Sequence, residues 1–160
     1  MFKINDKIIH FRDGIATIVG KTTMGDKEYF VIHTDSSPDA NIYVATTNTA
    51  NVIRPIMTKA EATALLKSLN KIEQETFNNT KQRRDYYKKK LLSGNVEDLL
   101  YLTGQLYYYD YSNAHGKVVK LGPTDLQMLK DAKKVLFDEL LISLNKNEKY
   151  IDKFFLSLLK

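Results

Sequence analysis

The most concentrated chemistry in this sequence is a cluster of cationic side chains between residues 81 and 90. Six lysines and arginines stand there against the single acid Asp85, and the resulting net charge of +5 equals that of the whole 160-residue chain. The rest of the chain is therefore close to neutral. A positive field confined to one segment attracts a polyanion, most commonly the phosphate backbone of a nucleic acid. The cations are Lys81, Arg83, Arg84, Lys88, Lys89 and Lys90.

The spacing of these cations predicts how a helix would present them. Lys81, Arg84 and Lys88 follow i, i+3, i+7 spacing and are expected along one side of it. Tyr86 and Tyr87 add planar rings, and one of the two is expected to be buried in the helical core. Two interpretations stay open at this point. The segment either contacts nucleic acid, or it is a solvated helix face whose lysine stems cover apolar surface.

Motifs for catalysis, metal binding or phosphate binding do not occur in the sequence. The three histidines, His10, His33 and His115, lie far apart and without metal-ligand spacing. The glycines form neither a P-loop nor a dinucleotide fingerprint, and there is no G-x-S-x-G nucleophile motif. The sequence thus predicts a protein that is not an enzyme and needs no cofactor. A small enzyme with a dispersed site is the alternative to this prediction.

Composition favours a globular protein that remains in the cytoplasm. Hydrophobic residues make up 43% of the chain and charged residues 27%, which suits a packed domain rather than a disordered one. The absence of cysteine excludes disulfides, thiolate zinc sites and cysteine nucleophiles, and agrees with a reducing compartment. We expect neither a secretory signal nor a membrane span, because no apolar run reaches the required length.

The first third of the chain has the pattern of short strands. Turn pairs occur at Asp13-Gly14 and Gly25-Asp26, between runs rich in β-branched and aromatic residues. Strands this short, joined by tight turns, predict a small and strongly bent barrel of the SH3 or Tudor kind. The predicted strands span residues 7–11, 15–20, 28–33, 41–45 and 51–53.

After Pro55 the apolar period changes to that of helices. Thr58 with Glu61 forms a capping box, Asn95 resembles another N-cap, and Pro123 suits a first helical position. We therefore predict an α+β chain with a β domain at residues 1–55 and a helical domain at 56–160. The predicted helices begin near residues 58, 80, 95, 123 and 147, and a polar loop is expected from Asp110 to Gly122. Their apolar faces include Ala62, Leu65, Leu66, Leu69, Leu99, Leu100, Leu102, Leu106, Leu126, Leu129, Ala132, Val135, Leu136, Leu140, Ile151, Phe154, Phe155 and Leu158.

Tyrosines are unusually dense between residues 101 and 111. Consecutive tyrosines of a helix cannot all point inward, so part of this group is expected at the surface. Contact with DNA sugars, with a protein partner or with another copy of the chain all stay open. The group comprises Tyr101, Tyr107, Tyr108, Tyr109 and Tyr111.

Several segments, taken in order, resemble one known family. Residues 2–9 with Gly14, then 27–32 and 51–56, resemble the RNA-polymerase-interacting module of the CarD-like transcription regulators, a module that also occurs in transcription-repair coupling factors. Residues 83–84 and 90–96 resemble the basic helix of that family and its Ser-Gly turn, and residues 129–136 with 139–140 resemble its late helix. The similarity covers nearly the whole chain and keeps the order of both modules.

The resemblance implies a non-enzymatic factor that acts at promoters. We expect no cofactor, no membrane contact and no small-molecule substrate; the sequence does not fix the oligomeric state, and a monomer is favoured. The Tudor-like module would dock on the β subunit of bacterial RNA polymerase by adding an edge strand, and the helical module would contact promoter DNA at the upstream edge of the melted bubble and stabilise the open complex. The implied polymerase-binding residues are Asn41, Ile42, Tyr43 and Val44, and the implied DNA-binding residues are Thr80, Lys81, Arg83, Arg84, Tyr87 and Lys88.

Several positions depart from the family pattern. Thr80 stands where many relatives have a tryptophan, and Tyr43 stands where an arginine is common in the fourth strand. A free-standing nucleic-acid-binding protein that needs no polymerase is the alternative function.

Overall fold

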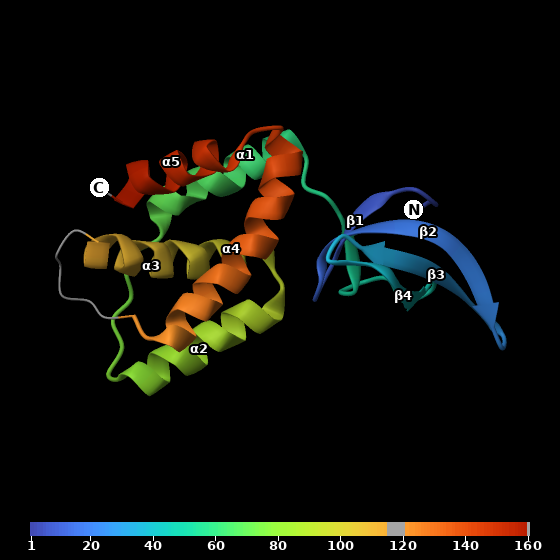
Figure 1. Cartoon of the computed structure of the whole chain (residues 1–160), viewed down its shortest axis with the longest axis horizontal. Coiled ribbons are helices and arrows are strands. Elements are labelled where there is room, and N and C mark those ends of the chain that lie inside the picture. Colours follow the sequence, from blue (N-terminus) through green and yellow to red (C-terminus); the bar gives the residue numbers. More distant parts are fainter. Residues whose placement is uncertain (115–120, 160) are drawn as a thin grey trace. The chain divides into compact units, whose positions relative to one another are not determined.

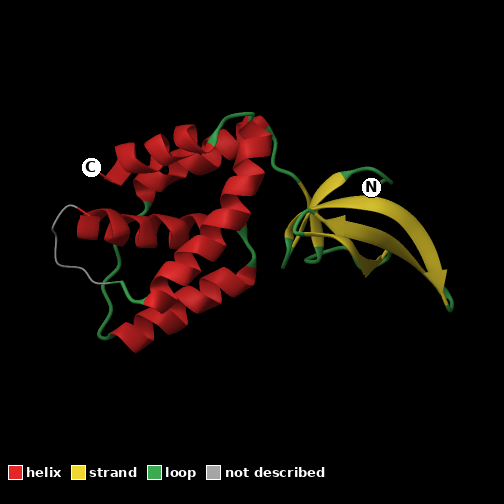
Figure 2. Ribbon diagram, viewed as in Figure 1, coloured by secondary structure: helices red, strands yellow, loops and turns green. Residues whose placement is uncertain are grey.

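The structure, a computed structural model, describes the backbone of residues 1–114 and 121–159 and the side chains of residues 1–107 and 121–157. It divides into two compact units, Met1–Met57 and Thr58–Lys160. The first unit contains strands and the second contains helices (Figure 2). The predicted α+β class is confirmed. Within the described residues, no helix has both the length and the apolar character needed to cross a membrane.

The first unit is one antiparallel sheet whose five strands lie in the order β4-β3-β2-β1-β5, a small sheet of the predicted Tudor-like kind. Glycines with positive φ sit at the turns where β-branched residues would be strained: Gly14 has a φ of 78° and Gly25 a φ of 63°. The strands, four of them labelled in Figure 1, are β1 (Lys7–His10), β2 (Gly14–Met24), β3 (Lys27–Thr34), β4 (Ser37–Ala45) and β5 (Ile53–Pro55).

Alternation along these strands builds the core of the first unit. The period-2 pattern sends every second side chain to the concave side of the bent sheet, where the buried residues are almost all aliphatic. Val19 lies at a register shift between β2 and β3 and is 41% exposed, which breaks the alternation locally. The buried cluster consists of Ile8, Ala16, Ile18, Phe30, Ile32, Val44 and Ile53.

The second unit is a bundle whose helix ends follow the predicted caps. The Thr58 hydroxyl accepts the Glu61 N–H at 3.1 Å, and the Glu61 carboxylate accepts the Thr58 N–H at 2.9 Å, which confirms the capping box. Gly94, with a φ of 68°, ends the basic helix. The elements are α1 (Lys59–Lys67), the 3-10 turn η1 (Ser68–Lys71), α2 (Thr80–Ser93), α3 (Val96–Ala114), α4 (Pro123–Leu144) and α5 (Glu148–Leu159).

Most of the predicted apolar positions are buried, with two corrections. Leu126 was expected in the core but is 45% exposed, and Asp125 beside it is fully buried instead. The helix that was expected to end near Tyr109 continues to Ala114, because residues 110–114 include neither glycine nor proline to stop it. The remaining part of the predicted loop, residues 115–120, lies outside the described residues, as does the side chain of Leu158.

The first unit contains a buried histidine beside a carboxylate. His10 is 6% exposed, and its Nδ1 lies 3.0 Å from the Asp13 carboxylate. Burial lowers the pKa of His10 below its ordinary value of 6.5, and the Asp13 carboxylate opposes this shift without cancelling it. The imidazole is therefore neutral in the folded unit at neutral pH.

We expect the first unit to lose stability as the pH falls below about 6.5, because the unfolded chain then binds a proton that the folded unit disfavours. His10→Gln should reduce this loss, and Asp13→Asn should enlarge it by removing the carboxylate that favours the protonated ring. Urea unfolding at pH 7.5 and 5.5 (roughly one unit on either side of the ordinary pKa), followed by NMR signals of the first unit, measures both effects. An identical pH dependence in all three proteins would contradict the assignment to His10.

Candidate functional site

The start of α2 is fixed by side-chain caps, which set the faces of the basic helix. The Asn79 side chain accepts the Gln82 N–H at 2.8 Å, and the Gln82 side chain accepts the Asn78 N–H at 3.0 Å. Thr80 is therefore the first helical residue and is exposed. Because the start is fixed, the direction of every later side chain follows from helical geometry.

A single buried carboxylate joins α2 to the beginning of α4. Asp125 is fully buried. Its Oδ2 accepts hydrogen bonds from Nη2 of Arg83 at 2.8 Å and from Nη2 of Arg84 at 3.3 Å. The same oxygen accepts the Gly122 N–H at 3.0 Å. We call Asp125 with Arg83 and Arg84 the arginine clamp.

The clamp explains both the glycine and the acid at the start of α4. A Cβ on Gly122 would lie 2.6 Å from Nη2 of Arg84, so no larger residue fits there without moving the guanidinium. Asp125 lies in the first turn of α4, where the helix dipole favours a negative charge. Two guanidinium groups, one main-chain N–H and the dipole together hold a carboxylate away from water.

The clamp divides the cations of α2 into an inner and an outer set. The Arg83 side chain is 13% exposed, whereas that of Arg84 is 37% exposed and so also reaches the surface. Lys81, Lys88 and Lys89 are exposed and form no ion pair with any described residue. The excess positive charge of the segment is therefore carried to solvent mainly by lysines.

Three of the cations of α2 border a groove between α2 and α4. Its volume is about 510 Å³. Lys81, Arg84 and Lys88 line it together, which confirms the face expected from their spacing. Asp85 is the single acid in this lining. The remaining lining residues are Thr80 on α2 and Thr124 and Met128 on α4.

Tyr87 lies on the opposite side of α2, as expected for one of the two neighbouring tyrosines. It is fully buried, and its ring centroid lies 5.5 Å from Phe77 and 6.5 Å from Tyr101. Tyr86 joins the same group, 5.6 Å from Phe77 and 6.1 Å from Tyr101. These rings hold α2 against α3 and against the segment that precedes α2.

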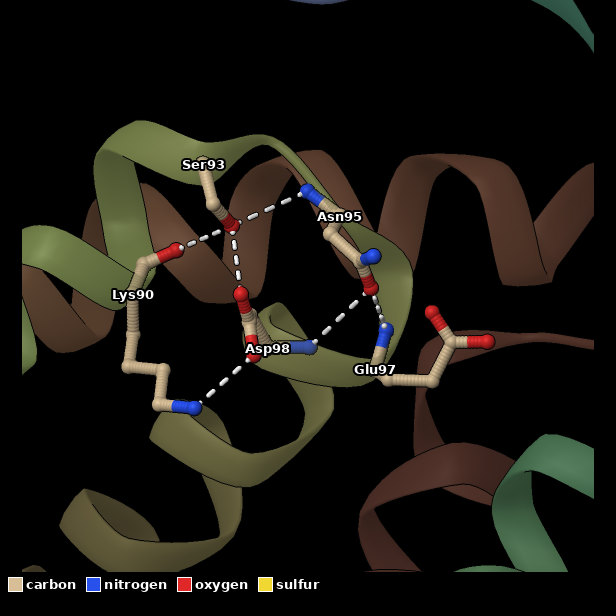
Figure 3. Close-up of polar contacts among 5 residues, drawn as sticks. All are labelled: Lys90, Ser93, Asn95, Glu97 and Asp98. Atoms are coloured by element: carbon tan, nitrogen blue, oxygen red, sulfur yellow. Dashed lines mark hydrogen bonds and ion pairs between the residues drawn. The ribbon is translucent and has the colours of Figure 1, made fainter.

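The last turn of α2 is tied to the start of α3 by a polar network (Figure 3). Lys90 Nζ donates to Asp98 at 3.0 Å, and the Ser93 hydroxyl donates to the second Asp98 oxygen at 2.8 Å. Asn95 accepts the N–H groups of Glu97 and Asp98, which confirms it as the cap of α3. These contacts make Lys90 a structural cation.

Opposite shifts in pKa accompany the Lys90–Asp98 pair. The hydrogen bond to Asp98 raises the pKa of Lys90 although burial opposes it. Burial on its own would raise the pKa of Asp98, but hydrogen bonds from Ser93 and Lys90 outweigh it and lower that pKa. Both groups are thus charged at neutral pH.

The first unit presents an open sheet edge at β4. This strand pairs with β3 alone among the described strands. The Thr46 N–H donates to the Glu28 carbonyl at 3.1 Å, and bonded and non-bonded pairs alternate along an antiparallel ladder. The main-chain groups of Tyr43 and Ala45 are therefore turned to the open edge.

Side chains of the same strand alternate between core and surface. Val44 is buried, and Ile42 packs against the core cluster. Tyr43 is 45% exposed, and its hydroxyl accepts the Asn41 amide at 3.3 Å. Asn41 in turn lies 2.6 Å from Nε2 of His33. The outer surface of the edge is thus polar and aromatic.

Other candidates from the sequence contribute no chemistry of this kind. The described residues include no group of three or more histidine or acidic side chains suited to a metal ion. Tyr107 donates to Asp152 at 2.7 Å and stacks on Phe155, so this member of the tyrosine group is structural. The side chains of Tyr108, Tyr109 and Tyr111, and all of His115, lie outside the described residues.

Comparison with protein families agrees with both units. The model described as the CarD-like/TRCF RID domain matches residues 2–57, and the model described as the CarD C-terminal domain matches residues 64–155. Together they define a transcription regulator that interacts with RNA polymerase. The chain belongs to the CarD-like family, a family of non-enzymatic regulators. No curated protein matches the chain.

Replacing Asp125 by Asn should destabilise the second unit strongly, because removal of one member of a buried ion pair leaves the other uncompensated. We expect the free energy of unfolding to fall by about 3 kcal/mol. Urea unfolding followed by circular dichroism at the helical band measures this change.

Asp131→Asn is the matched control. Asp131 lies on the exposed side of the same helix and accepts a hydrogen bond from Gln127 at 2.8 Å. This substitution should change the free energy of unfolding by about 0.5 kcal/mol or less. Equal effects of the two substitutions would show that the arginine clamp does not stabilise the fold.

Proposed function

We propose that this chain binds the β subunit of bacterial RNA polymerase through its first unit and contacts promoter DNA through its second. The DNA contact lies at the upstream edge of the melted bubble and stabilises the open complex. The main support is that two features occur in one chain that matches the family in both units. The β unit has an open sheet edge, and the helical unit has a groove lined by lysines that form no ion pair with any described residue. Such a regulator works as a cytoplasmic monomer without a cofactor.

Docking on the polymerase would use main-chain hydrogen bonds along β4. An extended segment of the β subunit would add a strand beside Asn41, Ile42, Tyr43 and Val44. The outward main-chain groups of Tyr43 and Ala45 are available for such pairing. Tyr43 also presents an exposed ring at a position where relatives often carry an arginine, so we expect an aromatic rather than a charged side-chain contact.

The DNA contact would be mainly electrostatic. Lys81 and Lys88 flank the groove, Thr80 adds a hydroxyl, and Arg84 shares its guanidinium between Asp125 and the groove. These groups suit the sugar–phosphate backbone, which positions a protein without reading sequence. Promoter choice would then come from the polymerase.

The expected DNA-binding set includes two residues that lie on the inner side of α2, Arg83 and Tyr87. They would support DNA binding indirectly, without touching DNA. Arg83 pairs with Asp125, and Tyr87 is buried among aromatic rings. We propose that both hold α2 in place while the outer residues contact the backbone. The rings of Phe77 and Tyr86 pack against each other, and we propose that neither replaces the tryptophan that many relatives have at the position of Thr80.

Stabilisation of the open complex requires a preference for melted over closed promoter DNA. A factor with equal affinity for both states would shift nothing. Tethering by the first unit would raise the effective concentration of α2 near the bubble. A weak contact with the DNA backbone is then sufficient, because strand addition at β4 already holds the chain beside the promoter.

Co-purification with polymerase subunits from a bacterial extract tests the proposal. Tyr43→Pro removes an outward N–H while leaving the ladder to β3 intact, because proline is tolerated where the N–H faces away from the sheet. Loss of one main-chain bond should weaken polymerase binding by up to about tenfold.

Tyr43→Ala keeps the N–H and removes the ring, so it separates the main-chain contribution from that of the side chain. Unchanged capture of polymerase by Tyr43→Pro would rule out docking through β4. A chain that captures no polymerase but binds bare duplex tightly would instead be a free-standing nucleic-acid-binding protein.

A further inference from the structure

A second cationic surface lies where α4 ends and α5 begins. Lys146, Lys149 and Lys153 are exposed there and, with Asn147 and Tyr150, line a shallow hollow of about 340 Å³. None of the three lysines forms an ion pair with a described residue. We call these three lysines with Tyr150 the α5 surface.

The acids of α5 are engaged elsewhere and do not neutralise this surface. Glu148 and Asp152 both lie 3.4 Å from Nζ of Lys133 on α4, and Asp152 also accepts the Tyr107 hydroxyl. Because Glu148 and Asp152 are four residues apart, they share one helix face, and Lys149 with Lys153 shares the next. The lysine side is left with uncompensated positive charge.

The helix end adds to this charge. Asn147 caps α5, since its side chain accepts the Tyr150 N–H at 3.0 Å. The helix dipole favours an anion at this end. Lys146 Nζ lies 5.4 Å from the centre of the Tyr150 ring, which is 43% exposed. A flat ring among lysines suits a sugar–phosphate backbone better than an acidic protein surface, because a sugar can pack on the ring while the lysines meet phosphates.

We infer that the α5 surface is a second contact for the backbone of duplex DNA, an inference that rests on the proposed function. The groove lies at the first turns of α4 and the α5 surface follows its last turn, at the other end of this helix in Figure 1. The 22 residues of α4 span about 33 Å, close to one turn of B-form DNA. The second contact would therefore reach phosphates about ten base pairs from the first.

Lysine acetylation footprinting of the intact chain tests this inference. The acetylation rate of each lysine is measured by mass spectrometry with and without a duplex that carries a short melted segment. We expect several-fold slower acetylation of Lys149 and Lys153 together with Lys81 and Lys88. Lys130 and Lys134, an exposed pair with the same i, i+4 spacing on α4, are the controls and should not change.

The outcomes separate the two proposals. Protection of Lys81 and Lys88 without Lys149 and Lys153 would overturn the α5 contact and leave the proposed function standing. Protection of Lys149 and Lys153 alone would exclude the groove as a DNA contact and would leave the α5 surface as a DNA contact.

A paired substitution completes the test. Lys149→Ala with Lys153→Ala should weaken duplex binding several-fold, whereas Lys130→Ala with Lys134→Ala should not. If purified polymerase without DNA protects the α5 lysines equally, the surface binds an acidic protein and the inference is wrong.

Discussion

One buried carboxylate determines how the second unit presents its charge. Asp125 has no access to water, so its charge is tolerable only while guanidinium groups and a main-chain N–H contact it. That requirement fixes the rotation of α2 against α4. With Arg83 and Arg84 turned toward Asp125, Lys81 and Lys88 border the groove on the outer side. The arginine clamp thus removes part of the positive charge and at the same time directs the remainder to one surface.

The two units use different physics for the proposed contacts. Strand addition along β4 relies on main-chain hydrogen bonds with fixed geometry and depends little on salt. The lysine surfaces of α2 and α5 rely on long-range attraction, which salt screens and which does not read sequence. A chain that combines them would be located by the polymerase and held to DNA by charge. The chain contains no tryptophan, so under this proposal its contact with DNA would rely on that charge.

Local signals were sufficient to predict much of the fold from the sequence. The capping box at Thr58, the glycine turns and the Asn95 cap depend on residues close in the chain, and the structure confirms each. Contacts between distant residues were not predictable in this way. The burial of Asp125 was not predicted, because its partners lie 41 and 42 positions earlier in the chain. The prediction that Leu126 lies in the core was wrong for the same reason, because burial of Asp125 turns the leucine side chain outward. The lysine face of α2 followed from spacing, whereas the groove beside it depends on α4.

The salt dependence of DNA binding tests the central claim most directly. The logarithm of the association constant for a promoter fork is measured against the logarithm of salt concentration for the unmodified chain and for Lys81→Ala with Lys88→Ala. If these lysines neutralise two phosphates, the slope should decrease in magnitude by about 1.8. The matched pair Lys130→Ala with Lys134→Ala should leave the slope unchanged. An equal slope for the chain with and without Lys81 and Lys88 would contradict the account.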